Sequence, residues 1–145
     1  MRLVIQRVRS AAVTIAGQPQ AAIGRGLLVL VGFRPGDGDA ELQRMTRRLP
    51  LMRLFEDGQG RMNASVADVG GAILLVPNFT LYADTRRGRR PGFSGAAPPE
   101  VAKPLFERFA ALLSQAAVPV RCGVFGADMQ VDLCNDGPVT VILED

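Results

Sequence analysis

The 145-residue chain contains no histidine and no tryptophan. Without an imidazole, neither a Ser–His nor a Cys–His pair is available to activate a nucleophile. Its two cysteines, Cys122 and Cys134, form no CxxC pair, and the chain carries neither a GxxxxGKS/T nor a GxGxxG phosphate loop. The sequence therefore predicts no bound metal and no cofactor, and any chemistry must proceed without imidazole.

A long apolar stretch is also missing. No run of the chain approaches the ~18 apolar residues that a membrane-spanning helix needs. Segment 1–15 alternates apolar and polar residues, which is typical of a strand and not of a signal peptide. Two thiols without an export signal indicate a reducing compartment, so we expect a cytoplasmic protein without membrane contact. The length predicts one domain over 1–145.

Lysine is almost absent as well, since Lys103 is the only one, and arginine dominates the basic side of a net charge of +3. Arginine suits phosphate because its planar fork binds oxyanions through paired hydrogen bonds. A dense arginine run comprises Arg86, Arg87, Arg89 and Arg90. The run is equally typical of a phosphate-binding loop and of a solvated loop, and genome composition also explains a high arginine content.

The hydrophobic pattern predicts about seven or eight strands. Continuous apolar runs indicate buried strands, whereas alternation indicates strands with one polar face. The expected strands are a first hairpin over 3–8 and 11–15, a buried strand at 27–33, a short strand at 52–55, an apolar run over 72–81 that Pro77 interrupts, and three C-terminal strands at 118–122, 129–134 and 139–143.

Two helices complete the pattern. Leu42, Met45 and Leu49 recur at helical spacing behind a candidate N-cap at 37 or 39, and a proline at 50 should end that helix. A second helix is expected over 98–113, with Pro104 either kinking it or delaying its start. Because many of the expected strands are neighbours in sequence, the fold class is α+β, with a mostly antiparallel, barrel-like curled sheet.

Two segments have awkward local sequences. Residues 77–80 (PNFT) interrupt an apolar run with a proline, which cannot donate to a strand ladder, so the chain must bulge, turn or reach a sheet edge there. Residues 135–138 (NDGP) stand between two expected strands and are typical of a hairpin turn. Taken alone, each segment favours a structural explanation over a functional one.

Taken together and in order, the motifs of the chain resemble the bacterial D-aminoacyl-tRNA deacylases, also called D-tyrosyl-tRNA deacylases. The similarity covers essentially the whole chain without a large insertion. Its motifs are Gln6–Arg7–Val8, Gly60–Arg61–Met62–Asn63, Asp68–Val69–Gly70–Gly71, Phe79–Thr80–Leu81 with Ala83–Asp84, Gly88–Arg89–Arg90–Pro91 with Phe93, Gly126–Ala127–Asp128–Met129, and Asn135–Asp136–Gly137–Pro138–Val139–Thr140.

The resemblance implies an enzyme that hydrolyses the ester between a D-amino acid, or a mischarged glycine, and the 3′ end of tRNA. It further implies a homodimer, with the Gly–Pro of the last motif in the cis form and reaching into the partner's active site. The residues carried over are Asn78, Phe79 and Thr80 for catalysis, Gly137, Pro138, Arg7 and Met129 for substrate binding, and, together with the charge run, Arg86, Arg87, Arg89 and Arg90 for tRNA.

Backbone groups suffice for this chemistry. Carbonyl oxygens at Gly137 and Pro138 can accept hydrogen bonds from the α-ammonium of the substrate and crowd the side on which an L side chain projects. The ribose 2′-OH lies beside the ester carbonyl by covalent geometry, and N–H groups near Phe79 and Thr80 can stabilise the oxyanion. We therefore expect Thr80 to position the substrate and not to attack it.

The chain departs from the family pattern at Pro77–Asn78, where Ser–Gln is usual. A related group that clears L-alanine from threonine tRNA also carries proline there, whereas residues 135–140 (NDGPVT) match the D-specific group. Two alternatives stay open: a non-catalytic tRNA-binding homologue that lost activity through this change, and an ordinary esterase using Thr80, which the absent base disfavours.

Overall fold

The computed structural model describes residues 1–86 and 88–145, so Arg87 of the predicted arginine run lies outside the described residues. In chain order the elements are β1 (Arg2–Ile15), β2 (Gln18–Ile23), β3 (Gly26–Gly32), α1 (Asp39–Arg48), η1 (Leu49–Leu51), β4 (Phe55–Glu56), β5 (Met62–Ala64), β6 (Ala72–Pro77), η2 (Phe79–Tyr82), α2 (Pro99–Leu113), β7 (Val120–Cys122) and β8 (Gln130–Glu144), where η marks a 3-10 turn.

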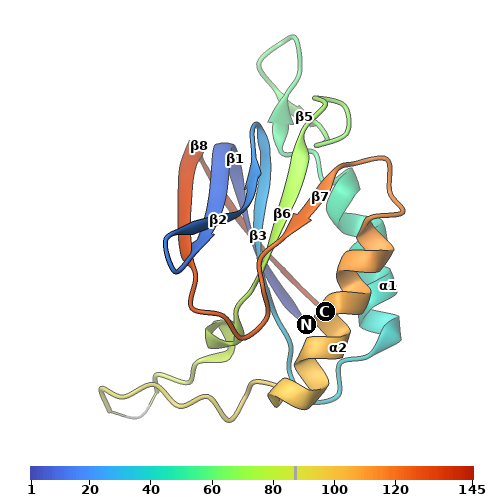
Figure 1. Ribbon diagram of the computed structural model, residues 1–145. Helices are drawn as coiled ribbons and strands as arrows, with labels where there is room; N and C mark the ends of the chain where they lie inside the picture. The colour runs from blue at the N-terminus through green and yellow to red at the C-terminus, as the bar shows by residue number, and fades with distance from the viewer. Residues whose placement is uncertain (87) are drawn as a thin grey trace.

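The long strand β1 organises the sheet. It pairs antiparallel with β2, β3 and β8, while β3 and β7 each pair parallel with β6. The strand order is β2-β1-β3-β6-β7, with β8 beside β1, and β2 curls back until it contacts β6 and β7 (Figure 1). The predicted α+β fold with a barrel-like sheet is confirmed, and the sheet is a nearly closed, mixed one.

Both helices cover the same face of the sheet (Figure 1). The main core lies between the helices and the sheet and includes Leu3, Ile5, Phe106 and Phe109, all at most 3% exposed. A smaller cluster around Val8 fills the inside of the curled sheet. Among the described residues, no helix is long and apolar enough to cross a membrane.

Two strand predictions are wrong because each expected turn lies inside a continuous strand. Segments 3–8 and 11–15 are not a hairpin but the single strand β1, which turns into β2 at Ala16–Gly17 with positive φ at both residues. Residues 135–138 are not a turn either, because β8 continues through them opposite β1 with shifts of register. The NDGP segment is therefore a bulge in a strand, and its Gly137–Pro138 peptide bond is cis.

The helix boundaries differ slightly from the prediction. Helix α1 is capped by Gly38, whose N–H donates to the Glu41 carboxylate at 2.8 Å. Asp37 is not the cap, because its carboxylate accepts a hydrogen bond from the α-ammonium of Met1 at 2.6 Å. Pro104 lies inside α2 and does not delay its start. The strand expected at 52–55 is reduced to Phe55–Glu56.

The contact between β3 and β6 yields a stability prediction. A Cβ at Gly26 would lie 1.9 Å from the carbonyl oxygen of Ala72. Gly26→Ala is therefore expected to lower the free energy of unfolding by about 3 kcal/mol, since β6 must move away. Gly24→Ala is the control, because no atom lies within 4 Å of a Cβ there; it should change stability by less than about 1 kcal/mol. Equal urea midpoints for the two variants would contradict the close approach.

Candidate active site

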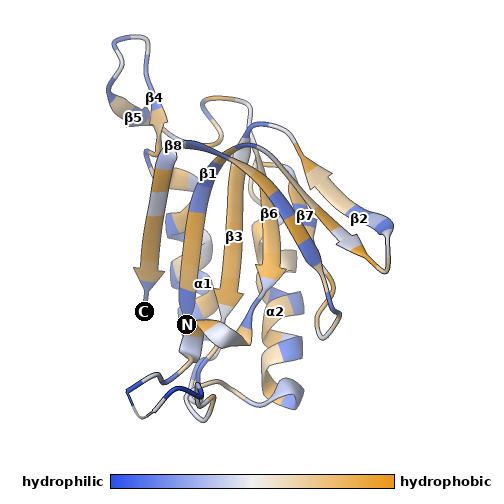
Figure 2. Cartoon of the chain, turned by 90° about the vertical axis from the view of Figure 1, so that its left-hand side faces the viewer, coloured by the Kyte–Doolittle hydropathy of each residue, from blue (hydrophilic) through white to orange (hydrophobic). Residues whose placement is uncertain are grey.

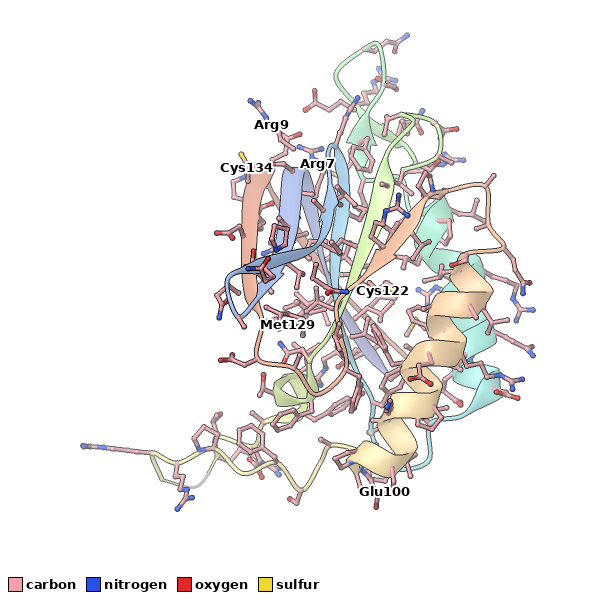
Figure 3. The ribbon with its side chains drawn as sticks, viewed as in Figure 1. Arg7, Arg9, Glu100, Cys122, Met129 and Cys134 are labelled. Carbon is pink, nitrogen blue, oxygen red and sulfur yellow. The ribbon has the colours of Figure 1, made fainter. Side chains whose placement is uncertain are left out.

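A cavity of about 560 Å³ opens where the parallel strands β3 and β6 end. Its walls come from these strands, from η2, from the start of α2 and from the segment that precedes β8. Most lining side chains are apolar, among them Leu30, Val76, Phe125 and Met129. The carboxyl ends of parallel strands are a common place for ligand sites. Met129, labelled in Figure 3 and predicted to bind the substrate, is one of the residues that line this cavity.

Pro77 can end β6 without loss of a strand hydrogen bond. Along β6 the N–H groups alternate in direction: Asn78 donates to Val31 on β3 at 2.8 Å, and Ile73 donates to Pro119 on the other side. The side that Pro77 faces belongs to β7, whose pairing with β6 has already stopped at Cys122. The missing N–H of Pro77 thus falls where no strand partner exists among the described residues.

Asn78 caps the turn η2. Its Oδ1 accepts hydrogen bonds from the N–H of Thr80 at 3.2 Å and from the Thr80 hydroxyl at 2.6 Å. Of the two N–H groups expected near the oxyanion, that of Thr80 is therefore occupied, whereas that of Phe79 has no acceptor within the described residues. The arrangement leaves the Phe79 N–H as a donor and the Thr80 oxygen as an acceptor, and both residues line the cavity.

The buried guanidinium of Arg7 supports the Gly137–Pro138 bulge through hydrogen bonds to the backbone. The Arg7 side chain is 8% exposed and donates to the carbonyl oxygens of Asp136 at 3.0 Å and Leu54 at 2.8 Å. Gly137 has φ of +127°, and a Cβ there would lie 3.0 Å from the Arg7 guanidinium. Glycine is therefore required at this position, while both bulge residues stay exposed to solvent.

Gln6 is a supporting residue that the sequence did not single out by itself. Its Oε1 accepts hydrogen bonds from Asn135 Nδ2 at 3.2 Å and from the Thr140 hydroxyl, so it spans the base of the bulge. The signal that identifies it is the pairing of Gln6 with Thr140 across β1 and β8. A hairpin turn at residues 135–138 would not predict this pairing, because the continuous strand β8 is what places Thr140 opposite Gln6.

Within one chain, the cavity with residues 78–80 and the Gly137–Pro138 bulge do not come together. Neither Gly137 nor Pro138 lines the cavity. Arg7, which contacts the bulge, pairs with Leu27, whereas the cavity begins three positions further along β3 at Leu30, about 10 Å away. In Figure 3, Arg7 and Arg9 lie well apart from Met129.

Arg86, Arg89 and Arg90 lie on an extended loop, here called the arginine loop, whose described residues project from the body of the molecule (yellow in Figure 1) and are largely hydrophilic (Figure 2). Two backbone hydrogen bonds between Asp84 and Gly92, at 2.7 and 2.9 Å, close its base. Arg86 grips both carboxylate oxygens of Asp84, at 2.9 and 2.8 Å, which holds the pKa of Asp84 well below its usual range. Arg89 and Arg90 have no acidic partner among the described residues.

Comparison with known proteins identifies the family of the chain. The model of the D-Tyr-tRNA(Tyr) deacylase family matches residues 4–144. The chain is 59% identical to the D-aminoacyl-tRNA deacylase of Chlorobaculum parvum, over 99% of this chain and 97% of that protein. It is 55% identical to the D-aminoacyl-tRNA deacylase of Carboxydothermus hydrogenoformans, over 99% of both proteins.

Solved structures show the same fold. The c-Myc DNA unwinding element binding protein is 41% identical, with a TM-score of 0.94 over 100% of this chain and 99% of that one. A probable eukaryotic D-amino acid tRNA deacylase is 16% identical with a TM-score of 0.78, over 98% and 97% of the two chains, which is a likeness of fold alone. Since the family match and the curated relatives span nearly the whole length, the chain belongs to the D-Tyr-tRNA(Tyr) deacylase family.

Proposed function

We propose that this deacylase, a hydrolase of the ester bond in D-aminoacyl-tRNA, builds its reacting centre from two copies of the chain. The observation that carries the proposal is the exposed, cis Gly137–Pro138 bulge, which is locked by Arg7 yet lies away from the cavity of its own chain. The cavity supplies Asn78, Phe79 and Thr80, and the bulge of the second copy supplies the chiral filter.

The reaction is a hydrolysis. A water oxygen bonds to the ester carbonyl carbon, the bond from that carbon to the ribose 3′ oxygen breaks, and the 3′ oxygen takes up a proton, which releases a free D-amino acid and tRNA. The ribose 2′-OH is held beside the carbonyl by covalent geometry and assists without a protein base. The N–H of Phe79 stabilises the oxyanion, and the Thr80 oxygen orients the substrate.

Rigid backbone explains the selectivity. The carbonyl oxygens of Gly137 and Pro138 accept hydrogen bonds from the substrate α-ammonium and occupy the space that an L side chain needs. A D-amino acid places only hydrogen there, and so does glycine, which is therefore also removed when mischarged. The contact with Arg7 and the Gln6 network support this rigidity.

The open face of the sheet supports a dimer. On the side opposite the helices, Ile142, Val4, Leu30 and Val76 lie opposite one another on four adjacent strands. Ile142 is 63% exposed, whereas Leu30 and Val76 line the cavity. In Figure 2, which views the sheet from this side, the strands β3 and β6 are coloured mostly as hydrophobic. A second copy seated on the row would cover exposed apolar surface next to the cavity, where its own bulge is needed.

The arginine loop is the tRNA contact of this proposal. Arg89 and Arg90 are available for backbone phosphates, and Arg86 shapes the loop through Asp84. Arg87 keeps the same assignment from the charge run, although it lies outside the described residues. We assign the protein to the cytoplasm, where aminoacyl-tRNA is consumed and free thiols such as Cys122 and Cys134 persist.

A chirality assay tests the function. The protein is incubated with D-Tyr-tRNA and with L-Tyr-tRNA, and loss of each ester is followed. We expect rapid hydrolysis of the D-form alone, because the bulge excludes the L side chain. Binding of tRNA without hydrolysis would identify a non-catalytic homologue, and cleavage of simple esters without tRNA would identify an ordinary esterase.

Replacement of Thr80 separates positioning from attack. Thr80→Ala should reduce hydrolysis of D-Tyr-tRNA by about ten- to a hundredfold and leave it measurable, since the hydroxyl orients the substrate without forming a bond to it. Thr80→Ser, which keeps the hydroxyl, is the matched control and should stay near wild type. Complete loss of hydrolysis in a folded Thr80→Ala protein that still binds tRNA would show that Thr80 is the nucleophile.

A complementation experiment tests the shared site. Ala127→Trp fills the cavity and leaves the bulge intact, whereas Gly137→Ala disrupts the bulge and leaves the cavity intact. Each variant alone should be inactive, and the co-expressed pair should regain about half of the wild-type activity per heterodimer, since one of its two sites is complete. If the pair stays inactive although heterodimers form, or if the protein sediments as a monomer, the cross-subunit site is refuted.

A further inference from the structure

An exposed pair of aromatic rings joins the active-site turn to the arginine loop. Phe79 and Phe93 meet with ring centroids 5.1 Å apart and planes at 69°, which is an edge-to-face contact. The two side chains belong to residues that are 55% and 41% exposed. Their contact therefore lies outside the hydrophobic core, at the surface between two functional segments.

The turn η2 depends on contacts of this kind because none of its residues is buried. On one side Asn78 N–H donates to Val31, and Arg2 donates to the carbonyl oxygen of Leu81 at 2.5 Å. On the side of the loop, Phe79 packs against Phe93. The position of Phe79, whose N–H faces the reacting carbonyl in our proposal, is thus set partly by the loop.

Phe93 stands at the base of that loop. Phe93 follows Gly92 directly, and Gly92 forms the two hydrogen bonds with Asp84 that close the arginine loop. The carbonyl oxygen of Phe93 accepts a hydrogen bond from Ala96 N–H at 3.0 Å. Two residues further on, Gly95 lies so near η2 that a Cβ there would be 3.3 Å from the Tyr82 carbonyl oxygen. The base of the arginine loop therefore packs against η2, and the rest of the loop points away from the body of the molecule (Figure 1).

We propose that Phe93 is a positioning residue that transmits binding of tRNA phosphates at Arg89 and Arg90 to the active-site turn. Phe93 does not line the cavity, so it acts through Phe79 and not on the substrate. Phosphates bound at Arg89 and Arg90 restrict the motion of the arginine loop, and the loop holds the ring of Phe93 in place. The ring of Phe93 in turn holds Phe79 with its N–H toward the ester. The inference rests on the proposed function, because it requires the arginine loop to contact tRNA.

The test is a mutant cycle on the complete protein with saturating D-Tyr-tRNA. Phe93→Ala should lower kcat by roughly two- to tenfold, as expected for loss of an edge-to-face pair, while the salt dependence of tRNA binding stays unchanged. The double change Arg89→Gln and Arg90→Gln should reduce that salt slope by about one to two and lower kcat by a similar factor. Combined with Phe93→Ala, it should lower kcat no further.

Two controls exclude a loss of folding. Phe93→Tyr keeps the ring and should retain wild-type kcat, and Leu51→Ala removes a side chain that is 72% exposed on η1 without touching the loop. All variants should unfold at similar urea concentrations. A normal kcat in Phe93→Ala, or effects that multiply in the combined variant, would overturn the coupling and leave the proposed function standing.

The arginine arm separates the two levels of the argument. If Arg89→Gln and Arg90→Gln leave both tRNA affinity and its salt slope unchanged, the loop is not the phosphate contact. That result removes the tRNA contact from the proposed function, and the coupling through Phe93 falls with it.

Discussion

The buried guanidinium of Arg7 is the interaction on which the functional arrangement depends. A buried cation is stable only when acceptors surround it, and Arg7 finds them in the carbonyl oxygens of Leu54 and Asp136, residues 47 and 129 positions away along the chain. A Cβ at residue 137 would lie 3.0 Å from the same guanidinium, and the φ of +127° there is strained for any other residue, so both space and backbone conformation call for glycine. One side chain of β1 thereby joins the segment before β4 to the bulge of β8 and keeps Gly137–Pro138 facing solvent.

The change from Ser–Gln to Pro77–Asn78 is compatible with an intact site. Pro77 loses an N–H that faces no strand partner among the described residues, since β7 has ended. Asn78 is one methylene shorter than glutamine, and its Oδ1 folds back onto Thr80. The backbone of η2 is consequently ordered by its own cap, and the N–H of Phe79 is left without an acceptor among the described residues.

The proposed catalysis needs no histidine and few polar side chains. The cavity walls are mainly apolar, and the polar residues that line it are Asn78, Thr80 and Asp128. In the proposed mechanism the ribose 2′-OH of the substrate lies beside the ester, so the protein needs a fixed geometry more than it needs a base. Geometry of that kind is provided by strands, by a locked bulge and by the arginine loop packed on η2.

Local sequence patterns were sufficient to predict several elements of the fold. The buried run at 27–33 became β3, helix α1 ends before Pro50, and the ordered motifs identified the family before any contact was known. Tertiary structure decided what local patterns cannot express. Residues 135–138 look like a hairpin turn because their composition is that of a turn, yet pairing with β1 on both sides keeps them within β8. The separation of the bulge from the cavity and the contact of Phe93 with Phe79 likewise arise from residues distant in sequence, and only the folded chain places them.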